Sequence, residues 1–254
     1  MQMDMGVKFL IISSGYNCSS YVKKCYESIL SQTYKNFDAI IIDDGSDQAT
    51  KDTLINLNNS DPRIEIFTCS ENKGAAYRRW QALHELSKKK FDPETVIVLL
   101  GLDDELFSFA LETIEDKYLE GNWMTYGNWI AQDGYQLPDG FLPFCPTIHA
   151  ERTYRKSVYR STGLNTFKKF LFDQLKEEDF KVNGHWVKAT TESNLMFSCL
   201  EMCGKDRIGI IYKPIVLYNK GRTDNARRRF GDEYQDGVYK DVINRPKKDL
   251  YESL

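Results

Sequence analysis

The chain has 254 residues, of which 41% are hydrophobic and 28% charged, and its formal net charge is −3. This balance is typical of a globular protein and argues against disorder, and the slight negative charge argues against a nucleic-acid binder. No stretch reaches the roughly 18 consecutive apolar residues of a membrane span, and the N-terminus does not have the pattern of a signal peptide. We therefore expect a cytoplasmic protein with no transmembrane segment, and peripheral contact with a membrane stays open.

Strands and helices alternate along the first half of the chain. Short apolar runs predict buried strands, and the segments between them carry apolar residues at helical spacing, as at Val22, Cys25 and Ile29. In chain order we predict a strand at Val7–Ser13, a helix at Tyr21–Leu30, a strand at Ala39–Asp43, a helix at Thr50–Leu57, a strand at Arg63–Cys69, a helix at Ala75–Lys88, a strand at Thr95–Leu100 and a helix at Phe109–Leu119. Four strand–helix units in a row predict an α/β fold with a mostly parallel sheet flanked by helices.

The alternation stops after Trp123. The segment "NWMTYGNWIAQDGYQLPDGFLPFCPTIH" is rich in aromatic residues, Gly and Pro, and it predicts a short antiparallel excursion with long loops. Helices are expected at Thr166–Leu175 and at Glu192–Cys203, the second ended by a glycine, and a final pair of strands within "IGIIYKPIVLYN". The tail Lys220–Arg229, "KGRTDNARRR", is basic and polar, and we expect it to be mobile.

Polar or acidic residues and a glycine follow each of the first four predicted strands. The four exits read "SSGYN", "DDGSD", "SENKG" and "GLDDE". Because ligands bind at the carboxyl ends of the strands in open parallel sheets, this edge is the expected binding site for a polar ligand. The first strand–helix turn has no GxGxxG, and no Walker loop is present, which argues against a dinucleotide cofactor.

These segments resemble the start of the family 2 glycosyltransferases of the GT-A fold. The resemblance rests on "SSGYNCSSYVKKCYESILSQTYKNFDAIIIDDGSDQAT", "ENKGAAYRRW" and "GLDDEL" over about the first 110 residues, and more loosely on "GLNTFKKFLF", "TESNLMFSCLEMCG" and "IVLYN". The sequence departs at Gly101, where many members have the first Asp of Asp-x-Asp-Asp, and at Glu192, where Asp is more usual. The resemblance implies one GT-A domain with a Rossmann-like sheet, a nucleotide-sugar-binding half at 1–120, a smaller antiparallel acceptor-side half at 121–219 and a tail at 220–254 that could act as a lid.

The resemblance also implies a nucleotide-diphosphate sugar as donor and a saccharide or glycoconjugate as acceptor. Asp44 can accept a hydrogen bond from a base N–H, with Tyr16 packed beside it. The residues expected to contact the nucleotide sugar are Ser14, Tyr16, Asn17, Asp44, Asn72, Arg79 and Asp103. Simpler interpretations remain for three of them: an Asx-turn for Asp44, a helix cap for Asn17 and a solvated helix face for Arg79.

Asp103 and Asp104 are the expected metal site. Two adjacent carboxylates removed from bulk water raise each other's pKa, and a divalent cation, Mn²⁺ or Mg²⁺, removes that cost while binding the phosphates of the donor. Because adjacent residues of a strand point to opposite faces, we expect one of the two to bind the metal and the other to contact ribose or water. The family resemblance favours Asp104 as the direct metal ligand and leaves Asp103 for the second role. The alternative is a plain polar loop.

Glu192 is the expected general base of an inverting, metal-dependent transfer. A position at the start of a helix keeps a carboxylate ionised, as a base requires, although helix starts often carry an acid with no catalytic role. His185 and Glu201 are weaker candidates, and the residues expected along the acceptor side are Trp129, Asp133 and Trp186. Two other functions stay open: a nucleotide-sugar-binding module without activity, and a nucleotidyltransferase, which would need a Gly-rich basic segment where "SSGYNCSS" stands.

Overall fold

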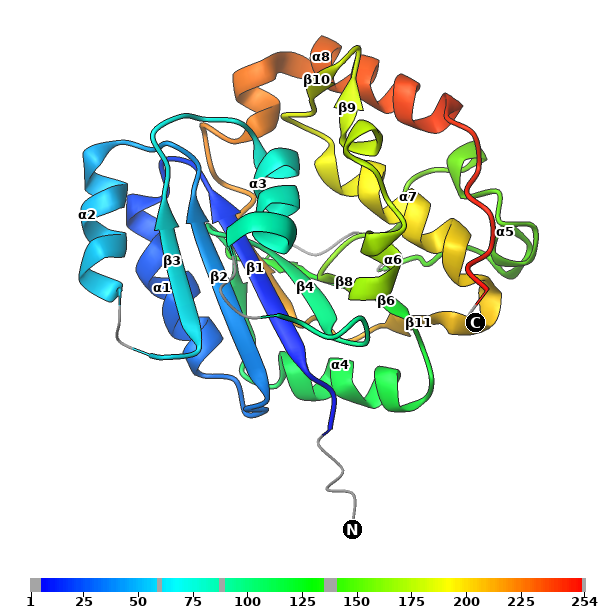
Figure 1. Ribbon diagram of the computed structural model, residues 1–254, viewed down its shortest axis with the longest axis horizontal. Coiled ribbons are helices and arrows are strands. Elements are labelled where there is room, and N and C mark those ends of the chain that lie inside the picture. Colours follow the sequence, from blue (N-terminus) through cyan, green and yellow to red (C-terminus); the bar gives the residue numbers. More distant parts are fainter. Residues whose placement is uncertain (1–5, 59–60, 87–89, 135–140, 253–254) are drawn as a thin grey trace.

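The computed structural model describes residues 6–58, 61–86, 90–134 and 141–252, without the side chain of Arg227. In this part of the chain a seven-stranded sheet has the order β11-β6-β8-β4-β1-β2-β3 (Figure 1). Its strands are β1 (Phe9–Gly15), β2 (Phe37–Asp43), β3 (Ile64–Thr68), β4 (Val96–Gly101), β6 (Met124–Gly127), β8 (Asn165–Lys168) and β11 (Ile208–Ile211). The β1–β2, β2–β3, β1–β4 and β6–β11 pairs are parallel, so the predicted mostly parallel sheet is confirmed.

Helices cover both faces of the sheet, because successive residues of its buried strands point to opposite sides. Phe9 and Ile11 of β1 pack in a core beneath α1 (Ser19–Leu30), α2 (Gln48–Leu57) and α4 (Ala110–Leu119). Leu10 and Ile12 belong to a second core on the other face, which is covered by α3 (Ala75–Gln81) and α7 (Thr191–Cys203). Each fully buried large apolar side chain contributes roughly 1.5–3 kcal/mol to stability, so the two cores fix the positions of the strand ends.

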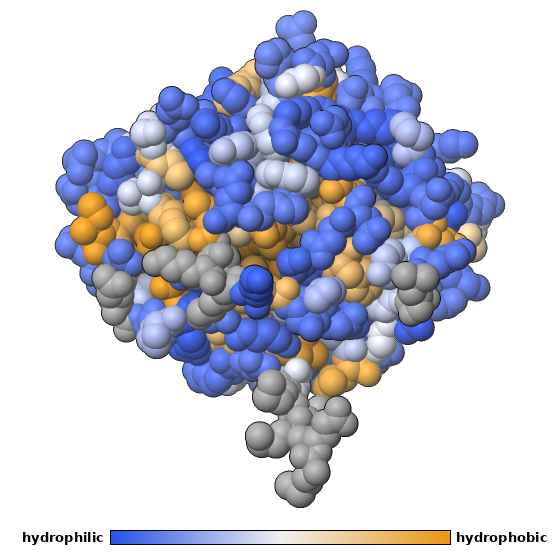
Figure 2. Space-filling model, viewed as in Figure 1, coloured by the Kyte–Doolittle hydropathy of each residue, from blue (hydrophilic) through white to orange (hydrophobic). Residues whose placement is uncertain are grey.

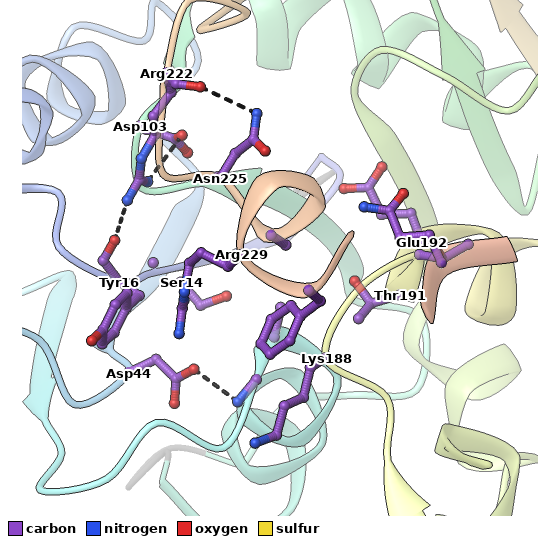
Figure 3. Close-up of a pocket in the computed structure, with 18 of the residues that line it drawn as sticks. Ser14, Tyr16, Asp44, Asp103, Lys188, Thr191, Glu192, Arg222, Asn225 and Arg229 are labelled. Carbon is purple, nitrogen blue, oxygen red and sulfur yellow. Dashed lines mark hydrogen bonds and ion pairs between the residues drawn. The ribbon is translucent and has the colours of Figure 1, made fainter. Parts of the chain in front are cut away.

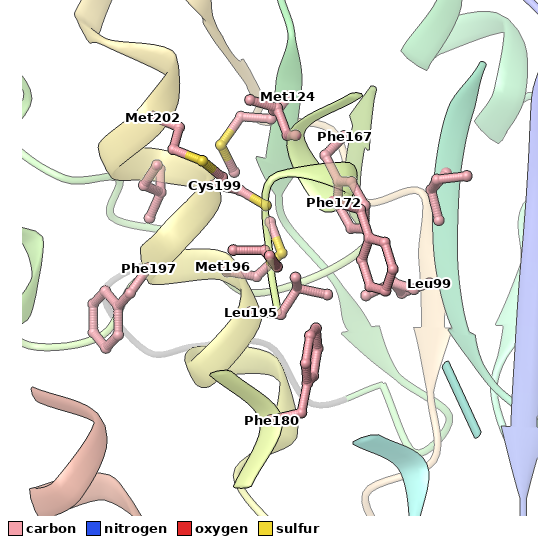
Figure 4. Packing of buried hydrophobic residues seen from close by; sticks show 14 of the residues in the cluster. Leu99, Met124, Phe167, Phe172, Phe180, Leu195, Met196, Phe197, Cys199 and Met202 are labelled. Atoms are coloured by element: carbon pink, nitrogen blue, oxygen red, sulfur yellow. The ribbon is translucent and has the colours of Figure 1, made fainter. Parts of the chain in front are cut away.

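The helix α7 is enclosed almost completely. Eleven of its residues, from Ser193 to Cys203, are buried, and Figure 4 shows Leu195, Met196 and Cys199 facing side chains of the sheet and of neighbouring segments. A helix that is buried on all sides belongs in the interior of a domain. Its first turn, which carries Glu192, therefore rests on a rigid support. In contrast, polar side chains cover most of the face of the molecule shown in Figure 2.

One predicted helix begins as a strand. Residues 165–168 form β8, which is antiparallel to both β4 and β6, and only Lys169–Asp173 (α6) are helical within the predicted range Thr166–Leu175. Thr166 and Phe167 are completely buried between the two neighbouring strands. Tertiary pairing therefore decides the conformation of this segment against its helical apolar spacing.

The two strands predicted near the end of the chain are present, and they belong to different sheets. β11 joins the large sheet beside β6, whereas β12 (Val216–Tyr218) lies in a small sheet between β5 (Glu105–Leu106) and β7 (Ile130–Ala131). This small sheet brings the segment after β12 next to the acids that follow β4.

Other elements are the helix α5 (Pro146–Glu151), the hairpin of β9 (Lys181–Val182) and β10 (His185–Trp186), and a π-helical turn, Ala82–Leu86, that continues α3. The predicted end of α3 at Lys88 lies outside the described residues.

The C-terminal tail contains a helix that the sequence analysis does not predict, and its mobility stays an expectation. Arg222 is 7% exposed, and residues Ala226–Asn244 form α8, whose backbone breaks from helical geometry at Gly231 (φ 80°). Val238 and Val242 are one helical turn apart, and both are buried in the core beside α7. These two valines anchor the second part of α8, and its first turns extend over the carboxyl edge of the sheet. No helix of the described residues has the length and apolar character needed to cross a membrane.

Candidate functional site

A cavity of about 580 Å³ lies at the carboxyl ends of β1, β2 and β4 (Figure 3). Of the residues predicted from the sequence, it is lined by Ser14, Tyr16, Asp44, Asn72, Asp103, Asp104 and Glu192. Figure 3 shows Glu192 on the opposite side of the cavity from Tyr16 and Asp103. Asn17 and Arg79 are not among its lining residues. The sheet thus brings together side chains that are up to 178 positions apart in the sequence, as between Ser14 and Glu192.

Asp44 joins the loops that follow β2 and β3 at the edge of the cavity. Its Oδ1 accepts hydrogen bonds from Arg78 Nε at 2.7 Å and from the Lys73 N–H at 2.9 Å, and its Oδ2 accepts one from the Gly74 N–H at 2.8 Å. A carboxylate offers about four acceptor positions, so one position on Oδ2 remains for a ligand. Asn72 supports the same loop, because its side chain donates to the Asp44 carbonyl at 3.0 Å. Asp44 therefore has a structural role in addition to the nucleotide contact that we expect.

Replacing Asp44 with alanine should lower the free energy of unfolding by about 3–5 kcal/mol, the usual cost of removing one partner from a buried ion pair. Arg78 is 3% exposed and would keep its charge without Asp44. Chemical denaturation measures the loss, and Asp52→Ala, at an exposed position of α2, is the control that should stay near the parent. An equal, small effect of both changes would contradict the structural role of Asp44.

The loop after β1 has its shape fixed by Asn17. This residue has φ 52°, its backbone N–H donates to Ser46 Oγ at 2.8 Å, and its side-chain oxygen accepts from the Asp47 N–H at 3.0 Å. The N-cap of α1 is Cys18, with no side-chain cap bond, so the alternative of Asn17 as a helix cap is wrong. The Tyr16 ring faces the cavity, and the guanidinium of Arg229 lies 4.0 Å from its centroid.

The two acids after β4 lie over the same residue. A Cβ atom placed on Gly101 would be 2.6 Å from Asp104 Oδ2 and 2.9 Å from Asp103 Oδ1, so both carboxylate oxygens approach one point. The predicted opposite orientation of Asp103 and Asp104 is wrong, because β4 ends at Gly101 and a turn follows in place of further strand. This close approach requires the absence of a side chain at position 101.

The surroundings of Asp104 disfavour the negative charge of its carboxylate. Burial, followed by the charge of Asp103, raises the pKa of the Asp104 carboxyl well above its usual range, against the lowering effect of the Asn219 N–H at 2.8 Å from Oδ1. Arg222 balances Asp103, with 3.1 Å between Nη1 and Oδ2. No group of three or more His, Cys, Asp or Glu suited to a metal occurs in the described residues. The pair therefore fits a divalent cation that takes its other ligands from phosphate oxygens and water.

Glu192 lies in the first turn of α7 and is held on both sides. Its Oε1 is 3.2 Å from Arg79 Nη2, and its Oε2 accepts from Asn165 Nδ2 at 3.4 Å. The preceding N-cap residue, Thr190, has φ 60°, a conformation that β-branched residues rarely adopt outside functional sites. The Glu192 side chain is 45% exposed, so a ligand in the cavity can reach it.

A second cavity of about 270 Å³ adjoins the first. The residues that line both cavities are Gly101, Asp104, Tyr159, Glu192 and Tyr218. Trp129 lines only the second, where its ring is 5.2 Å from that of Tyr218, so it stands where a sugar could stack on it. Glu192 and the carboxylate of Asp104 thus lie at the junction of two spaces.

The other two candidates for the acceptor side, Asp133 and Trp186, and the two weaker candidates for the general base, His185 and Glu201, line neither cavity. Trp186 packs on Tyr77 with ring centroids 5.0 Å apart, which supports a core role. Glu201 is 1% exposed and pairs with the buried Arg155 at 2.7 Å. His185 and Asp133 are exposed and are not among the residues that line the two cavities.

Several lining residues were not found from the sequence. They come from the loop before β8, the segment before α7, β12, and α8 with its N-cap residue, and they include Tyr159, Lys188, Tyr218, Asn225, Phe230, Gln235 and Tyr239. The basic and aromatic content of the first turns of α8 was the available signal. It was not decisive, because the weak apolar pattern of this segment does not predict a helix that packs on the domain.

Solved structures of similar fold were found at low sequence identity. S. aureus TarS 1-349 in complex with UDP-GlcNAc superimposes with a TM-score of 0.67 and 14% identity, covering 96% of this chain and 68% of that one. Glucosyl-3-phosphoglycerate synthase from Mycobacterium tuberculosis, in complex with Mn²⁺, UDP and glucosyl-3-phosphoglycerate, gives 0.64 and 12%, covering 96% and 83%. At these identities the likeness concerns the fold, which is the GT-A fold of glycosyltransferases.

Sequence relatives carry glycosyltransferase names. A GalNAc(5)-diNAcBac-PP-undecaprenol beta-1,3-glucosyltransferase of Campylobacter jejuni is 30% identical over 86% of this chain and 67% of its own length. Glycosyltransferase GlyA of Streptococcus pneumoniae is 29% identical over 66% of this chain, and the match spans only 25% of GlyA. The model of the family described as "Glycosyl transferase family 2" matches residues 11–174, more than half of the chain. The chain therefore belongs to glycosyl transferase family 2.

Proposed function

We propose that the protein transfers a sugar from a nucleotide-diphosphate donor to a hydroxyl group of a saccharide or glycoconjugate acceptor. The observation that carries this proposal is the junction of the two cavities, where Asp104 and Glu192 face both spaces. A donor in the larger cavity and an acceptor in the smaller one would meet between these carboxylates. The relative from Campylobacter jejuni, which is named for an undecaprenol-diphosphate-linked glycan, supports a glycoconjugate as acceptor.

Asp103 and Asp104 would hold a divalent cation, for which Mn²⁺ is the natural choice because it tolerates a site with few protein ligands. The M. tuberculosis synthase of the same fold contains Mn²⁺ together with UDP, which supports this choice. Such a cation supplies positive charge to the leaving nucleoside diphosphate. In this chain Asp44 and Tyr16 would orient the nucleobase of the donor. Asn72 keeps the loop around Asp44 in place.

Glu192 would act as the general base. Its carboxylate takes the proton from the acceptor hydroxyl while the hydroxyl oxygen attacks the anomeric carbon from the face opposite the diphosphate, so the configuration inverts. The half-exposed side chain at the edge of both cavities suits this role. Its position on the enclosed helix α7 keeps the carboxylate in place during the reaction.

The first experiment is a calorimetric titration with UDP, GDP and dTDP, each with and without Mn²⁺. We expect one nucleoside diphosphate to bind, and to bind more tightly with Mn²⁺. A panel of sugar donors on that nucleotide should then show slow hydrolysis, because water can replace the acceptor. Nucleotide binding without hydrolysis of any donor or transfer to any acceptor would indicate a binding module, and release of pyrophosphate from a nucleoside triphosphate and a sugar 1-phosphate would indicate a nucleotidyltransferase.

A further inference from the structure

We propose that Arg79 is a positioning residue that fixes the carboxylate of Glu192, and that it does not contact the donor. This inference rests on the proposed role of Glu192 as general base. Arg79 lies on α3, 113 residues before Glu192 in the sequence, and its Nη2 is 3.2 Å from Glu192 Oε1. Its Nη1 donates to Thr191 Oγ1 at 3.1 Å, so one guanidinium holds two successive residues at the start of α7.

The burial of Arg79 argues against a nucleotide contact. Its side chain is 8% exposed, and it lines neither cavity. Within the residues that the structure describes, its one ion pair is with Glu192. A buried guanidinium needs a charged or strongly polar partner, and here that partner is the carboxylate assigned to the proton transfer.

The second oxygen of Glu192 is supported by a chain of hydrogen bonds. Ser161 Oγ donates to Asn165 Oδ1 at 2.8 Å, and Asn165 Nδ2 donates to Glu192 Oε2 at 3.4 Å. Asn165 is 1% exposed on β8, in the middle of the large sheet. The carboxylate is therefore held from α3 on one oxygen and from β8 on the other, and the shorter, charge-assisted contact is the one from Arg79.

Two neighbouring arginines of α3 form ion pairs with carboxylates on opposite sides of the cavity. Arg78 pairs with Asp44 at 2.7 Å, beside the loop expected to bind the nucleobase. Arg79 pairs with Glu192, the proposed general base. Successive residues of a helix point about 100° apart, so a single turn of α3 can reach both. The helix thereby fixes the position of Asp44, which is expected to contact the nucleobase, relative to Glu192, the proposed general base. A misplacement of about 1 Å can cost about 100-fold in rate, so this contact should matter for kcat.

The test is a double-mutant cycle of Arg79→Met and Glu192→Gln, measured by steady-state transfer kinetics, with nucleotide affinity from calorimetry and thermal unfolding on the same samples. We expect Arg79→Met to lower kcat roughly 10- to 100-fold, to leave nucleotide affinity and the KM for donor near the parent values, and to cost nothing further in the Glu192→Gln background. Arg79→Lys, which keeps the charge but has one donor group, should recover part of the rate. Arg63→Met removes an ion pair far from both cavities and should keep the parent rate.

Each other outcome overturns the inference in a recognisable way. Equal losses from Arg79→Met in the parent and in the Glu192→Gln background would show that Arg79 acts independently of the carboxylate. A loss of nucleotide affinity would assign Arg79 to the donor, as the family resemblance implies. A Glu192→Gln variant with the parent rate would remove the proposed base itself, and the inference with it. If Arg79→Met does not fold, Arg79→Lys completes the same cycle.

Discussion

Replacing Asp104 with asparagine should reduce sugar transfer by at least about 100-fold in the presence of Mn²⁺, and a chelator should do the same to the parent protein. A bound cation contributes several kcal/mol to the stabilisation of the leaving group, and each 1.4 kcal/mol is tenfold in rate. Asparagine keeps the shape of the side chain, and its oxygen can still accept from the Asn219 N–H at 2.8 Å. The loss would therefore come from charge and metal affinity, which calorimetry with Mn²⁺ and nucleotide measures directly.

The same variant should be more stable than the parent when no metal is present. Burial and the charge of Asp103 raise the pKa of Asp104, so between the unfolded value of about 3.9 and the raised folded value the folded state binds the extra proton. The contribution of the Asp104 proton to the free energy of unfolding is then fully present below a pH of about 3.9. It is lost as the pH rises through the pKa that Asp104 has in the folded protein. Asn carries no charge, so Asp104→Asn in EDTA should melt at a higher temperature than the parent at pH 7, and the difference should vanish near pH 4.

Asp52→Asn, on the exposed surface of α2, serves as the control for both measurements and should match the parent. Full transfer by Asp104→Asn without added metal would exclude the proposed metal site. Equal melting temperatures of the variant and the parent at pH 7 would show that Asp104 does not carry an uncompensated charge in the metal-free protein.

Glu192→Gln should lower transfer by about 100-fold or more, the scale on which general-base catalysis contributes. Glutamine retains an oxygen that can accept from Arg79, so the local structure and the binding of nucleotide and metal should persist. Glu192→Asp, which has the residue more usual in the family, should keep partial activity because its shorter side chain places the carboxylate about one bond away.

Initial rates with saturating donor distinguish these variants, and calorimetry shows whether the nucleotide still binds. A Glu192→Gln variant that transfers sugar at the parent rate would mean that the base lies elsewhere. His185 would then be tested next, although it is exposed on β10 and is not among the residues that line the two cavities.

The first half of the fold could be predicted because its signals are local. The apolar runs of β1, β2, β3 and β4 are bounded by glycine and polar residues, and the structure places each strand within two residues of the predicted limits. The exits of parallel strands necessarily share one edge, so the sequence alone is enough to group Ser14, Asp44 and the acids after β4.

What the sequence did not reveal depends on contacts between distant segments. The strand β8 is too short to show a period, and only its insertion between β4 and β6 makes it a strand. The helix α8 depends on Val238 and Val242 meeting the core beside α7. The direction of Arg79 could not be inferred either, because its partner Glu192 is 113 residues away.

The glycine at the end of β4 has a consequence for substitutions at this position. A side chain at 101 would meet Asp104 Oδ2 at 2.6 Å and Asp103 Oδ1 at 2.9 Å. Both atoms are the ends of flexible side chains, so a residue larger than glycine would turn the two carboxylates away from the point that they share. The effect of a residue at 101 therefore depends on the residues at 103 and 104, and substitutions at these three positions should be non-additive.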